Sequence, residues 1–206
     1  MTRPEDLLRT GLAELGIPFG EDQVRLFLSC LAELKKWNKA HNLTSLRTDR
    51  DIIVKHFLDS LLFLGAVPAH AHSLADVGSG AGFPGVPITI MRPDLRVVLI
   101  EPTKKKAVFL RHVCHLLGLE GVEVRDQRLE EIEGLRVDVA VTRALFSVKD
   151  FMEKTQAILA AGGTLILSKG PDLDREMKDL DQSRISVSTQ RLPLEQADRF
   201  LVVVRA

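Results

Sequence analysis

The sequence predicts an α/β fold with a mostly parallel sheet flanked by helices. From residue 73 onward, short apolar runs alternate with amphipathic stretches of helical length. This is the pattern of βαβ units, whose parallel strands are apolar on both faces. Residues 1–70 instead show the three- and four-residue apolar spacing of helices. We therefore expect an N-terminal helical cap over residues 1–70, on the substrate side, and a ligand-binding α/β domain over residues 71–206.

The cap is predicted to contain three helices. The first begins at Pro4, where Thr2 and Glu5 form a capping-box pattern. A second begins near Glu21 and a third near Asp49, each with an apolar stripe that faces the core. The stripes are Val24, Phe27, Leu28, Leu31 and Leu34 in the second helix, and Ile53, Phe57 and Leu61 in the third.

Seven strands follow. Five are the apolar runs "SLADV", "RVVLI", "VEV", "VDVAV" and "GTLILS", which helix-length spacers separate. The last two, "RISVSTQRL" and "RFLVVVRA", are joined by a short loop that contains a proline and leaves no room for a helix. An antiparallel hairpin is therefore expected to finish the sheet.

Composition excludes several classes of protein. The two cysteines have no partner spacing, so neither a disulfide framework nor a metal site is predicted. The first ten residues, "MTRPEDLLRT", lack an apolar leader segment, and no run reaches membrane-spanning length. Lys and Arg number 28, as do Asp and Glu, so a polyanion would have to be held by a local patch. We expect a cytoplasmic monomer with no membrane partner.

The stretch "LADVGSGAGFPGVPI" places a glycine-rich turn between the first strand and a helix. Such a turn brings backbone N–H groups to a ligand at the head of the sheet. Read from Gly80, it matches the dinucleotide fingerprint G-x-G-x-x-G. However, the strand ends at Val77, so the turn begins at Gly78, and the sixth position is then Phe83 instead of a small residue. Asp76 just before the turn favours a cationic ligand such as S-adenosylmethionine, and a dinucleotide stays the alternative.

Further candidates follow the next strands at the same edge of the sheet. Glu101 ends the second strand, where its carboxylate suits two ribose hydroxyls, and Pro102 and Thr103 form the turn beside the adenine. Arg143 ends the fourth strand, where methyl donor and acceptor would meet. It has three possible roles: a fork on the cofactor carboxylate, recognition of guanine O6, or a structural ion pair. Leu129 and Glu130, after the third strand, are candidates to close over the adenine.

The methyl acceptor is narrowed by what the sequence lacks. Neither cysteine follows a strand, as methylation of a pyrimidine carbon requires, and "TRALFS" lacks the Pro-Pro-aromatic loop that exocyclic amines require. Methylation of a sugar hydroxyl requires a lysine within a set of acid–base residues, and the candidate Lys169 has no evident companions for such a set. A ring nitrogen such as guanine N7 remains, because its lone pair needs no general base. Small-molecule and protein acceptors stay open.

The chain also resembles a known family. The segments "KKWNKAHNLTSLR", "HFLDSLLFL", "DVGSGAGFPGVPI", "RLEE", "TRA" and "SKG", in this order, resemble the bacterial RsmG family, also called glucose-inhibited division protein B. The resemblance implies a class I, Rossmann-like methyltransferase that uses S-adenosylmethionine to methylate N7 of guanine 527 in 16S ribosomal RNA. Its partner would be that RNA, the small ribosomal subunit or an assembly intermediate. The cofactor contacts it implies are Gly78, Phe83, Leu129, Glu130 and Arg143.

An RNA-binding patch is expected between Lys35 and His56, where six Lys or Arg stand against two Asp, a net charge of +4. The candidate contacts are Lys35, Lys36, Lys39, Arg47 and Arg50, with Asn42 and His56 as polar groups. Asp59, three residues after His56, is expected to fix the tautomer of that histidine. Trp37 is expected to lock the cap in place more than to stack on a base. If the patch is neutralised, a small-molecule or protein methyltransferase is favoured; a non-catalytic ribosome-bound sensor is a third hypothesis.

Overall fold

The computed structural model describes residues 2–143, 145–170, 173–178 and 180–206. Its seven-stranded sheet has the order β3-β2-β1-β4-β5-β7-β6, parallel from β3 through β5 and antiparallel at β7 and β6. The predicted mostly parallel sheet with a C-terminal antiparallel hairpin is confirmed. The strands are β1 Ser73–Val77, β2 Arg96–Ile100, β3 Val122–Arg125, β4 Val137–Arg143, β5 Leu159–Lys169, β6 Ile185–Arg191 and β7 Asp198–Arg205.

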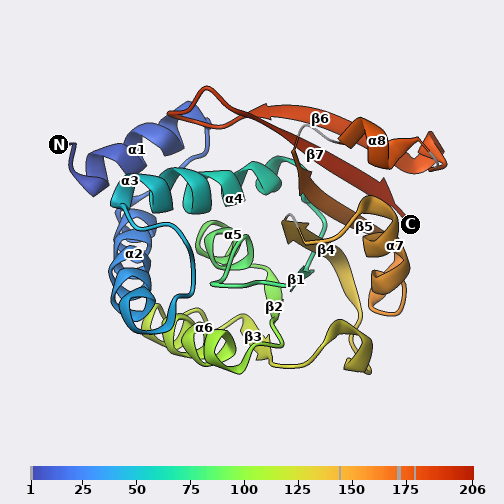
Figure 1. Cartoon of the computed structure of the whole chain (residues 1–206), viewed down its shortest axis with the longest axis horizontal. Helices are drawn as coiled ribbons and strands as arrows, with labels where there is room; N and C mark the ends of the chain where they lie inside the picture. Colours follow the sequence, from blue (N-terminus) through green and yellow to red (C-terminus); the bar gives the residue numbers. More distant parts are fainter. Residues whose placement is uncertain (1, 144, 171–172, 179) are drawn as a thin grey trace.

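The helices fall into two groups. The N-terminal ones lie on the left of the molecule in Figure 1 and continue to the right beneath β6 and β7: α1 Pro4–Glu14, α2 Glu21–His41, α3 Asp49–Ile52 and α4 Asp59–Leu61. A π-helical turn, Ile53–Leu58, joins α3 to α4, and a 3₁₀ turn, Leu62–Gly65, follows. The sheet is covered by α5 Gly85–Met91, α6 Lys104–Leu116, α7 Val148–Thr155 and α8 Leu173–Met177, and short 3₁₀ turns lie at Leu129–Glu131 and Gln182–Arg184.

The predicted start of the first helix is wrong in one detail. The residue before the helix is Arg3, not Thr2, and no side chain caps it. Pro4 occupies the first helical turn, where its missing N–H costs nothing. Arg3 instead pairs with Asp6 at 2.9 Å.

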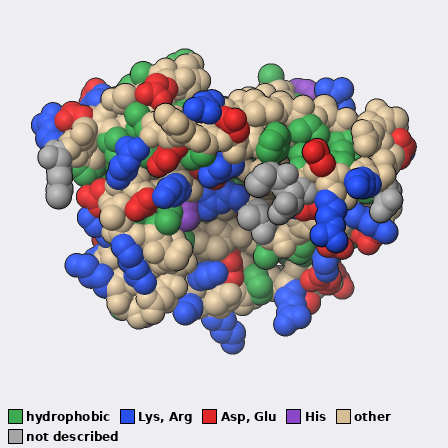
Figure 2. Space-filling model, turned by 45° about the horizontal axis from the view of Figure 1, so that its top comes forward, with side chains coloured by type: hydrophobic (Ala, Val, Ile, Leu, Met, Phe, Trp, Pro, Cys, Tyr) green, Lys and Arg blue, Asp and Glu red, His purple; other side chains and the backbone are tan. Residues whose placement is uncertain are grey.

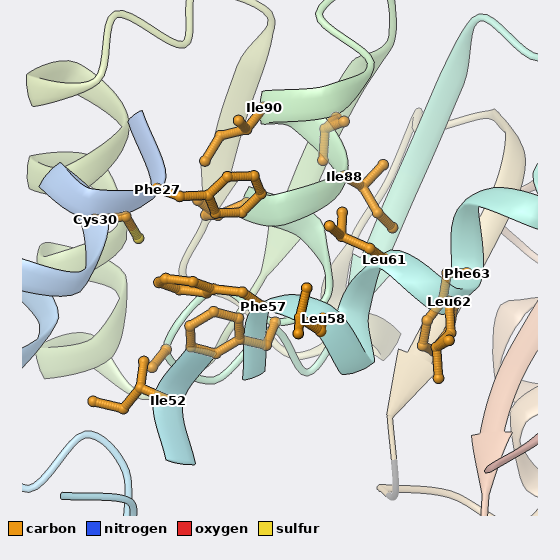
Figure 3. Packing of buried hydrophobic residues seen from close by; sticks show 14 of the residues in the cluster. Phe27, Cys30, Ile52, Phe57, Leu58, Leu61, Leu62, Phe63, Ile88 and Ile90 are labelled. Carbon is orange, nitrogen blue, oxygen red and sulfur yellow. The ribbon is translucent and has the colours of Figure 1, made fainter. Parts of the chain in front are cut away.

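The cap and the sheet share one hydrophobic core. Buried cap residues such as Phe27 and Phe57 belong to the same apolar cluster as Leu74 of β1 and Val97 of β2. Figure 3 shows Phe27 and Phe57 packed against each other, with ring centroids 5.2 Å apart. The predicted domain boundary near residue 70 stays a prediction. The apolar residues of the first seventy positions pack in the same cluster as those of the sheet, so the packing shows no separation there. All the predicted stripe residues are buried except Leu28, which is half-buried.

Removing the Phe57 ring is expected to destabilise the whole chain, because this side chain is fully buried where the cap meets the sheet. We expect Phe57→Ala to lower the free energy of unfolding by about 3–5 kcal/mol, the cost of a core phenylalanine truncation. Urea unfolding followed by circular dichroism measures it. Val108→Ala, at a position 50% exposed on α6, is the control and should change it by less than about 0.5 kcal/mol. Equal effects of the two substitutions would contradict the shared core.

Candidate active site at the carboxyl ends of the strands

Three predicted site residues meet at one edge of the sheet. Gly78 follows β1, Glu101 follows β2 and Arg143 ends β4. Since β2, β1 and β4 are adjacent and parallel, their carboxyl ends lie side by side. Figure 2 shows a hollow in the middle of one face of the molecule, with Lys, Arg, Asp and Glu side chains around it.

The glycine turn is tied to the end of β2. The N–H groups of Gly78 and Ser79 donate to the carbonyl oxygen of Ile100 at 2.9 and 3.1 Å. Gly78 and Gly80 have φ of +75° and +61°, a region that side-chain-bearing residues rarely adopt. A Cβ on Gly80 would meet only the Gly78 carbonyl oxygen, at 3.9 Å, so this part of the turn is open to a ligand.

The interpretation of Asp76 as a carboxylate facing the ligand is wrong. The side chain is fully buried, and its Oδ2 accepts a hydrogen bond from the Gly85 N–H at 2.8 Å. Alternation along the strand turns it toward α5, beneath the glycine turn. Among the described residues Oδ1 has no partner, and burial raises the pKa of Asp76 to about 7. Asp76 therefore supports the turn from below.

Glu101 joins the glycine turn to the segment after β2. Its Oε2 accepts from the Gly80 N–H at 2.9 Å, and its Oε1 accepts from the Thr103 N–H at 2.8 Å. Each carboxylate oxygen has a second lone pair for a further donor. Pro102 and Thr103 are exposed beside it. This buried carboxylate next to an open backbone turn fits a ribose with two hydroxyl donors.

Arg143 is bound to the cap by three hydrogen bonds. Its Nη1 donates to the Lys55 carbonyl oxygen at 3.0 Å and to Asp59 Oδ2 at 3.1 Å, and its Nη2 lies 2.9 Å from His56 Nδ1. A guanidinium has five N–H donors. Two therefore have no partner among the described residues. Arg143 therefore forms the structural ion pair that was one of its three predicted roles, with Asp59 as the partner. Its two remaining N–H groups can still donate to a ligand.

The tautomer of His56 follows from its neighbours. Arginine only donates, so Nδ1 must accept, and the proton lies on Nε2, which donates to Thr44 Oγ1 at 2.8 Å. Thr44 and Arg143 thus fix the ring, not Asp59 as predicted. The imidazole stacks on Phe83, with centroids 4.3 Å apart and planes 9° from parallel. Phe83 is buried, so its ring faces the cap, and only its backbone remains for the cofactor contact that was predicted.

Acid should destabilise the protein through His56. Burial, and secondarily the Arg143 charge, lower the pKa of His56 to about 3 from an ordinary value of 6.5. Between these values the unfolded chain binds a proton that the folded chain does not, so stability falls as pH drops below 6.5. We expect His56→Asn to remove at most about 2 kcal/mol of the stability difference between pH 7 and pH 5. Urea unfolding at both pH values measures it. Asp76 titrates equally in both proteins, so equal pH slopes would contradict the assignment.

Two candidates near the third strand are placed differently from each other. Leu129 is buried in the 3₁₀ turn after β3, and Glu130 is exposed and pairs with Lys154 of α7. That ion pair lowers the pKa of Glu130. The Glu130 carboxylate therefore has a partner on the protein surface. The discarded candidate Lys169 is largely buried and pairs with Glu176 at 2.7 Å.

The predicted basic patch is partly neutralised. Lys35 pairs with Asp49, Lys36 with Glu33 at 3.4 Å, and Arg50 with Glu195 at 3.7 Å. The local count of +4 overstated the available charge, because two acids from outside the segment, Glu33 and Glu195, also pair with its basic side chains. The candidates for which no ion pair is found among the described residues are Lys39 and Arg47.

Asn42 and Trp37 have clear structural roles. Asn42 ends α2 in the left-handed region, with φ of +49°, and its Oδ1 accepts from Arg47 at 3.0 Å. Trp37 lies 5.6 Å from Phe109 and 5.1 Å from His112 between ring centroids, so it joins α2 to α6. The expectation that Trp37 locks the cap is confirmed.

Sequence reasoning missed the role of Asp59 and the participation of Arg199. Asp59 is buried and accepts from Arg143 and from Arg199 Nε at 2.7 Å. The two partners lie 84 and 140 residues away in sequence. The signal available was an acid within the mostly apolar run "FLDSLLF", because a buried carboxylate requires a cationic partner.

No group of three or more His, Cys, Asp or Glu arranged for a metal is found in the described part of the chain. Within the same residues, no helix is long and apolar enough to cross a membrane.

The sheet order, the antiparallel β7 and the glycine turn after β1 define a Rossmann-like methyltransferase fold. A solved methyltransferase from Geobacter sulfurreducens has the same fold, with a TM-score of 0.63 over 96% of this chain and 97% of that one, at 18% identity. The family is shown by sequence. The sequence-family model for rRNA small subunit methyltransferase G matches residues 23–200. The chain belongs to that family.

Two relatives are similar over nearly their whole length. Ribosomal RNA small subunit methyltransferase G of Neisseria gonorrhoeae is 37% identical over 202 residues, which cover 97% of each chain. The protein of the same name from Geotalea uraniireducens is 37% identical over 208 residues, covering 96% of this chain and 94% of its own. The resemblance drawn from the sequence motifs is confirmed.

Proposed function

We propose that the chain transfers a methyl group from S-adenosylmethionine to N7 of guanine 527 in 16S ribosomal RNA. The observation that carries the proposal is the meeting of Gly78, Glu101 and Arg143 at one edge of the sheet, in a chain of the rRNA small subunit methyltransferase G family. The cofactor would supply an electrophilic methyl group on a sulfonium. The dinucleotide alternative is disfavoured by this family membership.

The residues present fit this cofactor. Gly80 offers a stretch of backbone that no described side chain covers, whereas the side chain of Leu145 lies over Gly78. Glu101 offers a buried carboxylate for ribose hydroxyls. Pro102 and Thr103 lie beside it, where the adenine would pack, with Leu129 and Glu130 further along the same edge. Phe83 would contribute through its backbone.

The acceptor chemistry asks little of the protein. Guanine N7 carries an in-plane lone pair that is unprotonated at neutral pH, so no general base is required. Catalysis then rests on holding the nucleophile in line with the methyl group. Arg143, with two N–H donors left at the end of β4, is the proposed positioning group there.

The proposed RNA contacts lie on the cap. Lys39 and Arg47 can face phosphates directly, whereas Lys35, Lys36 and Arg50 would have to exchange an acidic partner for RNA. The basic side chains of these pairs are exposed enough to water that such an exchange costs little, although their acidic partners are half-buried. Asn42 and His56 remain candidate polar contacts. The substrate would be the small ribosomal subunit, an assembly intermediate or the free RNA.

We propose further that the protein works as a monomer in the cytoplasm, where ribosomal subunits are assembled. In the described part of the chain, the large exposed apolar side chains are Val108, Leu116, Leu145 and Val187. Two of them lie on α6, one lies in the loop after β4, and one lies on β6. Single exposed apolar residues of this kind are ordinary on monomers.

Incubation with methyl-labelled S-adenosylmethionine tests the proposal. Small subunits, deproteinised 16S RNA and total small-molecule extract, each from cells lacking the enzyme, are the three acceptors. We expect label in RNA. Label in small molecules or protein would favour a small-molecule or protein methyltransferase, the alternative that the partial neutralisation of the basic patch supports. Cofactor binding without transfer to any acceptor would favour a non-catalytic sensor.

A further inference from the structure

The buried carboxylate of Asp59 binds two arginines from distant strands. Oδ2 accepts from Arg143 Nη1 at 3.1 Å, and Oδ1 accepts from Arg199 Nε at 2.7 Å. The side chain of Asp59 is 5% exposed, against 19% for Arg143 and 30% for Arg199. One acid of the cap thus holds the end of β4 and the start of β7 together.

The surroundings explain why the arginines need this carboxylate. The π-helical turn Ile53–Leu58 presents the Lys55 carbonyl to Arg143, and His56 accepts from the same guanidinium. The carbonyl carries no charge, and His56 is neutral because its Nδ1 accepts from Arg143 and burial lowers its pKa to about 3. Asp59 is therefore the single acid that pairs with Arg143 or Arg199 among the described residues. A carboxylate removed from water in this way is stable only when it is paired.

The arrangement fixes the direction of the Arg143 guanidinium. Nη1 is held by Asp59 and Lys55, and Nη2 by His56, so three contacts from consecutive turns of one helical segment determine the plane of the group. The two remaining donors then point in a set direction at the end of β4. Loss of the Asp59 charge removes the strongest of these contacts, since hydrogen bonds between charged groups are about twice as strong as neutral ones.

We propose that Asp59 is a positioning residue for methyl transfer, acting through Arg143. It rests on the proposed function, because Arg143 must face the reacting groups for its orientation to matter. In this account Asp59 touches neither substrate nor cofactor. A misplacement of about 1 Å in a positioning group can cost roughly 100-fold in rate.

Two substitutions separate positioning from plain stability. Asp59→Asn removes the charge and leaves one oxygen to serve two arginines. Asp59→Glu keeps the charge and moves it by one methylene, which an ordinary ion pair tolerates. We expect both to lower kcat on small subunits by roughly 10- to 100-fold, at a temperature where circular dichroism shows each variant folded. The matched control is Asp51→Asn, in the same helical segment, whose carboxylate pairs with Lys55 at 2.8 Å; it should keep its rate within about twofold.

The double variant Asp59→Glu with Arg143→Lys is decisive. If Asp59 acts through Arg143, the double variant should be no slower than Arg143→Lys alone, because the group being oriented is already gone. If the rate loss of the double variant equals the product of the two single losses, the proposal is overturned. A wild-type rate for folded Asp59→Glu would also overturn it. If Asp59→Asn does not fold, Asp59→Glu still decides the question. Failure of the proposed function looks different, since the wild-type protein would then label no RNA.

Discussion

Replacing Arg143 by lysine should lower turnover on small ribosomal subunits by roughly 100-fold, the scale for losing one aligned donor in an active site. A lysine ammonium cannot donate at once in the directions of the Lys55 carbonyl, Asp59 and His56 and still present a fork to a ligand. Steady-state rates with labelled cofactor measure the loss. Arg111→Lys, at a half-exposed arginine that pairs with Asp126 at 3.0 Å, is the control and should leave the rate unchanged.

The same variant also separates the three roles considered for Arg143. If it binds the cofactor carboxylate, the dissociation constant for S-adenosylmethionine should rise with the loss of rate. If it recognises guanine, cofactor affinity should hold while the rate on RNA falls. Unchanged affinity and unchanged rate would leave a purely structural ion pair and contradict the proposed role.

The second large effect is expected at Glu101. Glu101→Gln replaces two acceptor oxygens with one, so the Gly80 N–H and the Thr103 N–H can no longer both be satisfied. Both N–H groups are part-buried, so leaving one of them unsatisfied costs at most about 1–3 kcal/mol. Loss of the carboxylate also weakens the bonds to ribose hydroxyls. We expect the affinity for S-adenosylmethionine to fall by roughly 100-fold, measured by equilibrium dialysis.

Two controls accompany this change. Glu123→Gln removes an exposed carboxylate that pairs with Arg125 at 2.7 Å and should not alter binding. Glu130→Gln tests the candidate beside the third strand; since its carboxylate already pairs with Lys154, we expect a smaller loss than at Glu101. Wild-type affinity for Glu101→Gln would show that this carboxylate does not contact the cofactor.

The sequence predicted the layers of the fold and the edge where the site lies. Apolar runs fix the strands, and the carboxyl ends of parallel strands must meet, so Gly78, Glu101 and Arg143 could be grouped without coordinates. The direction of a buried acid could not be obtained in the same way. Asp76 stands before the glycine turn, yet alternation along β1 turns its carboxylate beneath the turn.

Long-range charge pairing was beyond sequence reasoning. The patch between Lys35 and His56 was counted as +4, and no local pattern shows that Glu195 reaches Arg50. The same holds for Arg199, which reaches Asp59 across 140 residues. Helix periodicity placed Asp59 in a cap helix, and its spacing of three residues from His56 suggested that histidine as its partner. The true partners are two arginines, which only tertiary packing brings to it.

The most direct test of the account is the identity of the methylated atom. Small subunits from cells lacking the enzyme are incubated with the protein and S-adenosylmethionine, and the 16S RNA is digested and analysed by mass spectrometry with mapping of the modified position. The account predicts one new 7-methylguanosine, at position 527, and a roughly 100-fold lower initial rate of its formation with Arg143→Lys under the same conditions. A methyl group on another atom or another nucleotide, or an equal initial rate from the Arg143 variant, would contradict it.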